Sequence, residues 1–253
     1  MEGPHTKIRP LSELVIPVEA SFNDFVEKHG GELVRNLIQN INPAKNADYV
    51  FRSPLVIGEL KCIERTAFTE EDGKKLNELA AKWVRVGLIP PFYGRIQIEL
   101  RNLPAPCQQD MLKALQAPWK NKLAAANKQI KRTKVTLEMP DACGVLFLVN
   151  DAPSWIQPYD AMNLITRVLQ AKKDDGRNVY SHLDWIVYFS VNARVIKDGK
   201  GWNFWLPGYR TKSEPNISAF LDQLRDAWFE FHSKLIRLDK EVFQVRSGTE
   251  GLL

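Results

Sequence analysis

The sequence lacks several features that would assign it to a familiar class of protein. Its longest apolar stretches, such as 145–149 and 185–189, are too short to span a bilayer, and residues 1–11 have no signal-peptide core. Three cysteines lie too far apart for a disulfide framework or a zinc knuckle. Four scattered histidines show no metal-ligand spacing, and no P-loop motif occurs. We therefore expect a cytoplasmic protein with reduced cysteines and no membrane partner.

Composition and charge are compatible with one globular domain. The chain has 253 residues, of which 44% are hydrophobic and 26% are charged. Its formal net charge of +5 suits an anionic partner such as nucleic acid. Many basic proteins bind no nucleic acid, so the charge supports such a function without establishing it.

Hydrophobic periodicity predicts an α/β protein, with a central mixed β-sheet flanked by helices. We expect an irregular lead-in over 1–20, a single domain over 21–240 and a tail over 241–253. Helical periodicity covers 22–41 (with a possible break at Gly30-Gly31), 69–83, 111–132 (with an interruption at Pro118), 159–173 and 218–236. Strand patterns cover 47–51, 54–63, 94–100, 142–151 and 183–191.

The most informative segment is 47–63. Its second strand is apolar on both alternating faces, as expected of a buried strand, yet Glu59 and Lys61 interrupt it. Being two residues apart on a strand, they project from the same face. Charged side chains are rarely buried without a partner, so their presence in such a strand requires a reason.

Asp48 supplies that reason if the two strands form a hairpin. With a two-residue loop at Ser53-Pro54, Asp48 would lie directly across from Glu59, with β-carbons about 5 Å apart. The two carboxylates would repel each other, and a divalent cation would turn this repulsion into coordination. A longer loop would shift the register, because proline is an awkward second turn residue.

Asp48, ten intervening residues and then Glu59-Leu60-Lys61 resemble the active-site motif of the PD-(D/E)xK nuclease superfamily. The flanking elements also match its common restriction-endonuclease-like core. That core has a helix, a strand with the aspartate, a strand with E-x-K, a helix and a further strand. The resemblance covers roughly residues 21–150. Ala47 stands where the name-giving proline would be, a position that varies widely in the superfamily.

The resemblance implies a Mg²⁺- or Mn²⁺-dependent nuclease. Asp48 and Glu59 would hold the metal with the carbonyl of Leu60, and Lys61 would orient or deprotonate the attacking water. Some family members add a glutamate from the first helix, for which Glu32 is our candidate and Glu27 the second choice. A solvated carboxylate on a helix face is an equal explanation for either.

A run of basic residues offers candidates for nucleic-acid binding. No acidic residue occurs from 111 to 137, and Trp119 within this run could lie near a base. The candidates in this run are Lys120, Lys122, Lys128, Lys131 and Arg132, together with Lys113 and Lys134. Lys74 and Lys75, on the helix that follows the motif, are comparable candidates. A solvated helix face explains such a run equally well. Asp151 and Asp184, at strand ends, are better explained by turn or capping roles.

The leading function is metal-dependent hydrolysis of phosphodiester bonds in nucleic acid, DNA before RNA, in defence against foreign DNA or in DNA processing. The alternative is a non-catalytic nucleic-acid-binding or scaffold subunit with a degenerate nuclease fold. A homodimer, or a separate helicase or sensor protein as partner, is compatible with either function.

Overall fold

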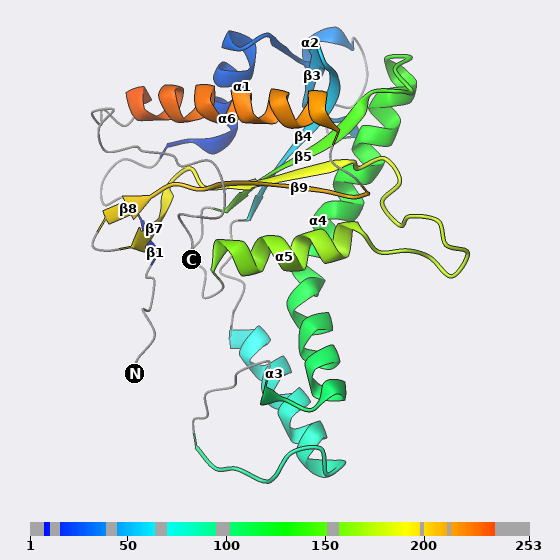
Figure 1. The fold of residues 1–253 in the computed structure, drawn as a ribbon, viewed down its shortest axis with the longest axis vertical. Helices are drawn as coiled ribbons and strands as arrows, with labels where there is room; N and C mark the ends of the chain where they lie inside the picture. Colours follow the sequence, from blue (N-terminus) through cyan, green and yellow to red (C-terminus); the bar gives the residue numbers. More distant parts are fainter. Residues whose placement is uncertain are drawn as a thin grey trace.

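The computed structural model describes residues 8–10, 16–38, 45–63, 70–94, 102–150, 157–197, 200–211 and 214–235. A six-stranded mixed β-sheet forms its centre, flanked by helices on both faces, which confirms the predicted fold class (Figure 1). In spatial order the strands are β2 (Gly31–Leu33), β3 (Tyr49–Arg52), β4 (Leu55–Ile63), β5 (Cys143–Asn150), β6 (Trp185–Phe189) and β9 (Trp205–Tyr209).

The middle of the sheet is parallel and its edges are antiparallel. Strands β4, β5 and β6 pair in parallel, whereas β2, β3 and β9 run antiparallel to their neighbours. Parallel strands are covered on both faces, which is why β5 and β6 read as unbroken apolar runs. A small second sheet contains β1 (Ile8–Pro10), β7 (Ala193–Lys197) and β8 (Lys200–Trp202).

Two pairs of helices cover the central sheet. Helices α1 (Val18–Lys28) and α6 (Pro215–Leu235) cover one face, where Phe22 and Trp228 are fully buried. Helices α4 (Ala105–Thr136) and α5 (Pro158–Leu169) cover the other, where Leu123 and Ile165 are fully buried (Figure 1). The core therefore forms two apolar layers, one on each face of the sheet.

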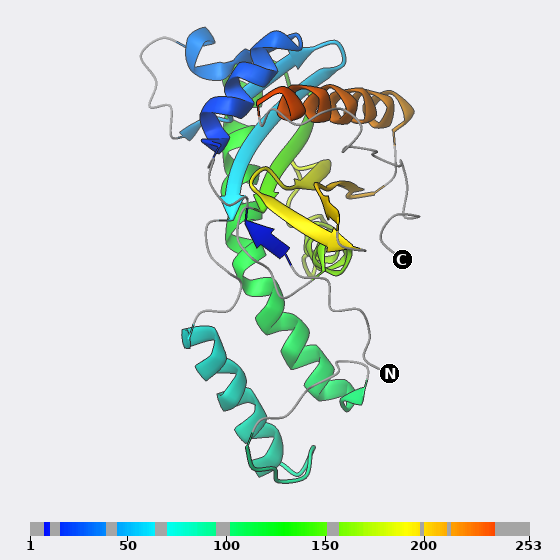
Figure 2. The same cartoon turned by 90° about the vertical axis from the view of Figure 1, so that its left-hand side faces the viewer.

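An arm of two helices projects beyond the sheet. Helix α3 (Glu70–Arg85) packs against the N-terminal part of α4 around Trp83 and Met111 (Figure 2). The interruption predicted at Pro118 is wrong, because α4 runs through this position as one helix. The N-terminal part of α4 packs against α3, and its C-terminal part packs against the sheet. A continuous helix allows both contacts to form.

Other predictions need correction in detail. Residues 31–33 form strand β2 rather than a helix, and α2 (Val34–Leu37) has only one turn. At Gly31 a Cβ would lie 2.7 Å from Cε1 of Phe51, so the missing side chain lets this segment pair closely with β3. Strand β1 lies in the segment expected to be irregular, and α1 already begins at Val18. Residues 95–100 of the strand predicted at 94–100, Asp151 and the tail at 241–253 lie outside the described residues.

None of the helices in the described part of the chain combines the length and the apolar character that crossing a bilayer requires.

Candidate active site

The β3–β4 hairpin has the predicted register. Tyr49 pairs with Gly58 and Arg52 with Leu55, so the turn consists of Ser53 and Pro54, whose peptide bond is cis. Asp48 directly precedes β3, and its amide nitrogen donates a 3.1 Å hydrogen bond to the carbonyl of Gly58. The hairpin therefore brings Asp48 beside Glu59, as the sequence predicted.

β4 continues beyond the beginning of β3, which leaves one edge of its C-terminal half without a strand partner in the described part of the chain. Asp48 occupies the start of this edge, where its Oδ2 accepts a 2.8 Å hydrogen bond from the amide of Leu60. In a strand the N–H and C=O of alternate residues point to the same edge. The carbonyl of Leu60 therefore faces the same side as that of Gly58, toward Asp48.

Glu59 is a buried carboxylate with one committed oxygen. Its side chain has no exposed surface, and Oε1 accepts a hydrogen bond from Nζ of Lys61, whose side chain is 22% exposed. Oε2 is equally buried and has no hydrogen-bond partner in the described structure. A buried carboxylate oxygen without a donor is costly, so this atom identifies a position where a ligand would stabilise the site.

Both carboxyl groups have raised pKa values. Burial and, to a smaller extent, the charge of Asp48 raise the pKa of Glu59 to about 8, against the lowering effect of the Lys61 ammonium. Burial also raises the pKa of Asp48, against the lowering effects of the Leu60 amide and of Lys61. Glu19 adds a further raising contribution to Asp48. Negative charge is therefore crowded into a poorly hydrated place.

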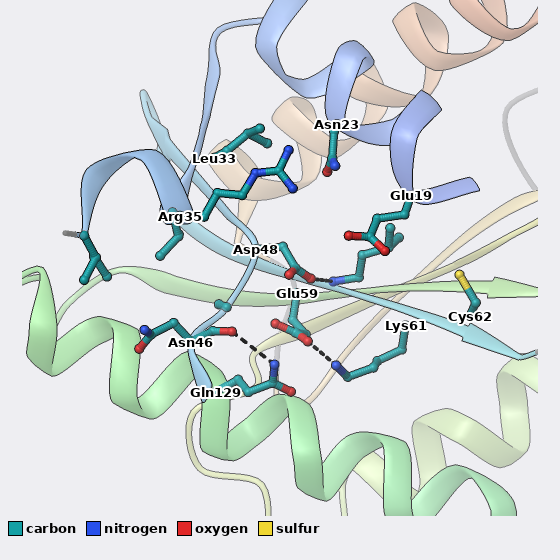
Figure 3. Close-up of a pocket in the computed structure, with 14 residues that line it drawn as sticks. Glu19, Asn23, Leu33, Arg35, Asn46, Asp48, Glu59, Lys61, Cys62 and Gln129 are labelled. Atoms are coloured by element: carbon teal, nitrogen blue, oxygen red, sulfur yellow. Dashed lines mark hydrogen bonds and ion pairs between the residues drawn. The ribbon is translucent and has the colours of Figure 1, made fainter. Parts of the chain in front are cut away.

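These groups open into a pocket of about 360 Å³ (Figure 3). Residues from four other parts of the fold contribute to its wall: Glu19 and Asn23 of α1, Arg35 of α2, Asn46 of the segment before β3, and Gln129 of α4. Figure 3 shows Glu19 on the α1 side of the two carboxylates and Gln129 on the opposite side. The pocket thus combines three carboxylates with two cationic side chains, Lys61 and Arg35.

Gln129 was not predicted from the sequence. Its Nε2 donates a 3.0 Å hydrogen bond to the carbonyl of Asn46, and one turn further along α4 the hydroxyl of Thr133 accepts a 2.7 Å bond from the amide of Ala47. These two bonds fix the segment that carries Asp48 against α4. The sequence gives no signal for this role, because the glutamine lies within a run whose visible feature is positive charge.

The glutamate expected to complete the site, Glu32, does not line the pocket, whereas another glutamate does. Glu32 lies on β2, where its carboxylate forms an exposed ion pair with Arg52, and it does not line the pocket. Glu27 lines a neighbouring pocket instead. Glu19, on the first turn of α1, lines the pocket of Asp48 and Glu59. The sequence did not point to Glu19, because residues 1–20 were predicted to be irregular.

None of the predicted nucleic-acid-binding residues lines this pocket. Most of them are exposed, whereas Lys122 is half-buried. Trp119 is buried in the core with its ring edge-to-face against Tyr188, so its expected position near a base is wrong. Asp184 has a structural role, because its carboxylate accepts hydrogen bonds from the amide of Gly144 and from Arg210.

The donor set fits a hard divalent cation. Mg²⁺ is commonly held by one or two carboxylates and completes its octahedron with water, and oxygen donors of this kind are present in Asp48, Glu59 and the Leu60 carbonyl. The unpartnered Oε2 of Glu59 is the observation that supports the fit. Within the described residues, no group of three or more His, Cys, Asp or Glu side chains is arranged as a ready metal cage. Water would therefore have to supply the remaining ligands.

Comparison with protein-family models, with curated proteins and with solved structures found no match for this chain. The resemblance to the PD-(D/E)xK superfamily therefore remains a prediction, which rests on the motif and on the geometry of the site.

Proposed function

We propose that the protein hydrolyses phosphodiester bonds of nucleic acid in a Mg²⁺- or Mn²⁺-dependent reaction, with DNA as the first substrate to test. The observation that carries this proposal is the buried Oε2 of Glu59, which has no hydrogen-bond partner in the described structure. Glu59 lies beside Asp48, and its other carboxylate oxygen accepts a hydrogen bond from Lys61. Two buried carboxyl groups side by side, both with pKa values raised chiefly by burial, are a poor arrangement for stability alone. They suit the binding of a cation.

The order of elements supports the proposal. Helix α1, strand β3 after Asp48, strand β4 with Glu59 and Lys61, helix α4 and strand β5 follow one another as the resemblance predicts. Additional elements, β2 and the α3 arm, are inserted without displacing this order. A role in defence or DNA processing belongs to the same proposal and rests on the resemblance alone.

The side chains divide the work by charge. Asp48 and Glu59 would hold the cation through one oxygen each, with the Leu60 carbonyl beside them. When bound, Mg²⁺ or Mn²⁺ lowers the pKa of a coordinated water and polarises the scissile phosphate. Lys61 is free to exchange its contact with Glu59 for the attacking water or a phosphate oxygen, because its side chain reaches the pocket surface. There its positive charge would offset the negative charge that develops in the transition state.

Cleavage assays test the proposal. Supercoiled plasmid and linear single- and double-stranded DNA are incubated with Mg²⁺, with Mn²⁺ or with EDTA, using the wild type and Lys61→Ala. The expected result is metal-dependent cleavage that Lys61→Ala reduces at least about a hundredfold, as is typical for loss of a group that stabilises transition-state charge. The pattern of products then distinguishes nicking from digestion at ends.

Lys28→Ala provides the matched control, since Lys28 also pairs with a carboxylate, Asp24, but lies on α1 outside the pocket. Its cleavage rate should equal that of the wild type. Absence of cleavage with every metal, together with absence of Mn²⁺ binding by calorimetry, would overturn the proposal. Nucleic-acid binding without cleavage would then favour the alternative of a non-catalytic binding subunit.

A further inference from the structure

Helix α4 has an unusual distribution of charge. It carries seven basic residues and a single acidic one, Asp110, which already accepts hydrogen bonds from Lys82 and Trp83 of α3. Several basic side chains elsewhere in the described structure form ion pairs with carboxylates, as in Lys28–Asp24 and Arg210–Asp184. On α4, Lys134 is the basic side chain for which the described residues show an ion pair, with Asp184 at 3.8 Å, so most of the positive charge of this helix has no carboxylate partner among them.

Three of these lysines lie in a line. Lys113, Lys120 and Lys131 are separated by seven and eleven residues, which places each within about 20° of the next at about 100° per residue. All three are exposed, and none forms an ion pair with any residue that the structure describes. We define them as the lysine stripe. At 1.5 Å per residue it is about 27 Å long.

The lysine stripe faces away from the candidate active site. Lys131 is two residues after Gln129 and Lys120 is nine before it, so both lie about 180–200° round the helix from the side chain that borders the pocket. Lys122, by contrast, shares the flank of Gln129. A nucleic acid that occupies the pocket and one that follows the stripe would therefore contact opposite flanks of α4.

The positive potential extends to the neighbouring loop. Burial lowers the pKa of His182 first, and the charges of Lys134 and Lys131 lower it further. His182 is joined to α4 by a 2.8 Å hydrogen bond from its amide to Asn127. The positive charge of α4 thus reaches the loop that contains His182.

We propose that the lysine stripe binds the phosphate backbone of a double-stranded nucleic acid, as a second contact surface separate from the catalytic pocket. Its length corresponds to about eight base pairs at 3.4 Å per pair. Surfaces for single strands combine charge with exposed aromatic rings, and the exposed large apolar residues of the described chain include no aromatic on α4. The opposite face of the helix is buried in the core, so α4 has no free apolar face for a membrane.

This inference depends on the proposed function only for the choice of nucleic acid as the anion. Its test measures binding in the absence of catalysis. Fluorescence anisotropy of a labelled 20-base-pair DNA duplex in EDTA compares the wild type with Lys113→Gln/Lys120→Gln/Lys131→Gln. We expect a loss of affinity of about tenfold or more at low salt. The plot of the logarithm of the association constant against the logarithm of the salt concentration has a negative slope, and its magnitude should decrease by about 2.7, at about 0.9 per lost phosphate contact.

The matched control is Lys28→Gln/Lys82→Gln/Lys234→Gln, which removes the same net charge at exposed lysines that are ion-paired. Thermal unfolding of both variants shows that they are folded. Equal losses in the two triple variants, or no loss in either, would overturn the stripe. So would a stripe-dependent affinity for phosphatidylserine vesicles, or for a single strand, that exceeds the affinity for the duplex.

The two proposals can fail separately. Stripe-dependent duplex binding with no cleavage under any metal would leave the stripe in place and overturn the nuclease. Metal-dependent cleavage, with DNA binding unaffected by the stripe substitutions, would support the nuclease and overturn the stripe. If both hold, the stripe variant should show a raised KM on long duplexes and an unchanged kcat.

Discussion

The amide of Leu60 donates a 2.8 Å hydrogen bond to Oδ2 of Asp48, at the beginning of β3, where β4 continues with β5 as its only strand partner among the described residues. A side-chain carboxylate thus takes the place of the carbonyl that the next residue of a partner strand would supply. This bond orients the carboxylate of Asp48 beside Glu59, while the carbonyl of Leu60 faces the same edge. The candidate metal ligands are therefore held in place by the pairing of the hairpin itself.

Replacement of Glu59 by glutamine tests the raised pKa of Glu59 through the pH dependence of the melting temperature. The raised pKa of Glu59 means that the folded state binds its proton more tightly than the unfolded state. Its stabilising contribution is fully present below the unfolded pKa of 4.5 and is lost as the pH rises through about 8. The melting temperature of the metal-free wild type should therefore fall between pH 5 and 8 relative to Glu59→Gln.

Addition of Mg²⁺ or Mn²⁺ at pH 8 should raise the melting temperature of the wild type and leave that of Glu59→Gln almost unchanged. Glu32→Gln is the control, because Glu32 is an exposed glutamate in an ion pair outside the pocket. It should follow the wild type in both pH dependence and metal response. Parallel pH curves for the wild type and Glu59→Gln would contradict the raised pKa.

Gln129→Ala should lower the cleavage rate by acting on the segment before β3. The substitution removes the hydrogen bond to the carbonyl of Asn46 and loosens the residues that lead to Asp48. Misplacement of a catalytic group by about 1 Å lowers rates by up to about a hundredfold, so we expect kcat to fall more than KM rises.

Gln108→Ala is a close control for this prediction. Gln108 lies on the same helix and its Nε2 donates a 2.7 Å hydrogen bond to the carbonyl of Leu103, in the arm and away from the pocket. The two variants should lose similar stability, and only Gln129→Ala should lose activity. Equal rates in both would show that Gln129 has no positioning role.

Glu19→Gln should weaken metal binding. Glu19 lines the same pocket as Asp48 and contributes to the raised pKa of that residue, so its negative charge reaches the site. We expect Mn²⁺ affinity, measured by calorimetry, to fall by about tenfold, as for the loss of an outer partner of a metal site. Glu27→Gln, two turns further along α1, should bind Mn²⁺ as the wild type does, and an equal effect of the two substitutions would refute a specific role for Glu19.

The part of the site that could be predicted depends on local pairing. A hairpin with a two-residue turn fixes which residues oppose each other, so the neighbourhood of Asp48 and Glu59 followed from their positions in the chain. Lys61 followed from strand alternation, which places it on the face of Glu59.

The other side chains come from segments whose packing the sequence does not specify. Glu19 and Gln129 reach the pocket because α1 and α4 cover opposite faces of the sheet at the end of β4, which depends on tertiary packing. The helical pattern around Gly31 was misleading, because Leu33 and Val34 are buried in a strand and a short helix whose combined spacing imitates one helix. Helix α4 continues through Pro118 because packing at both ends outweighs the local disruption.

Two glycines should respond to alanine in opposite directions. At Gly144, a Cβ would overlap the carbonyl oxygen of His182, which is backbone and cannot move aside as a flexible side chain can. Gly144 also exchanges hydrogen bonds with Asp184, through its amide to the carboxylate and through its carbonyl to the Asp184 amide. Gly144→Ala should therefore destabilise the protein by about 3 kcal/mol and lower its melting temperature by about 10 °C.

Gly73 lies within α3, and nothing surrounds the position of its missing Cβ within 4 Å. Gly73→Ala should stabilise the arm by about 0.5–1 kcal/mol through helix propensity alone. Differential scanning calorimetry measures the melting temperatures of both variants. A melting temperature for Gly144→Ala at or above that of Gly73→Ala would contradict the close contact between Gly144 and the His182 carbonyl.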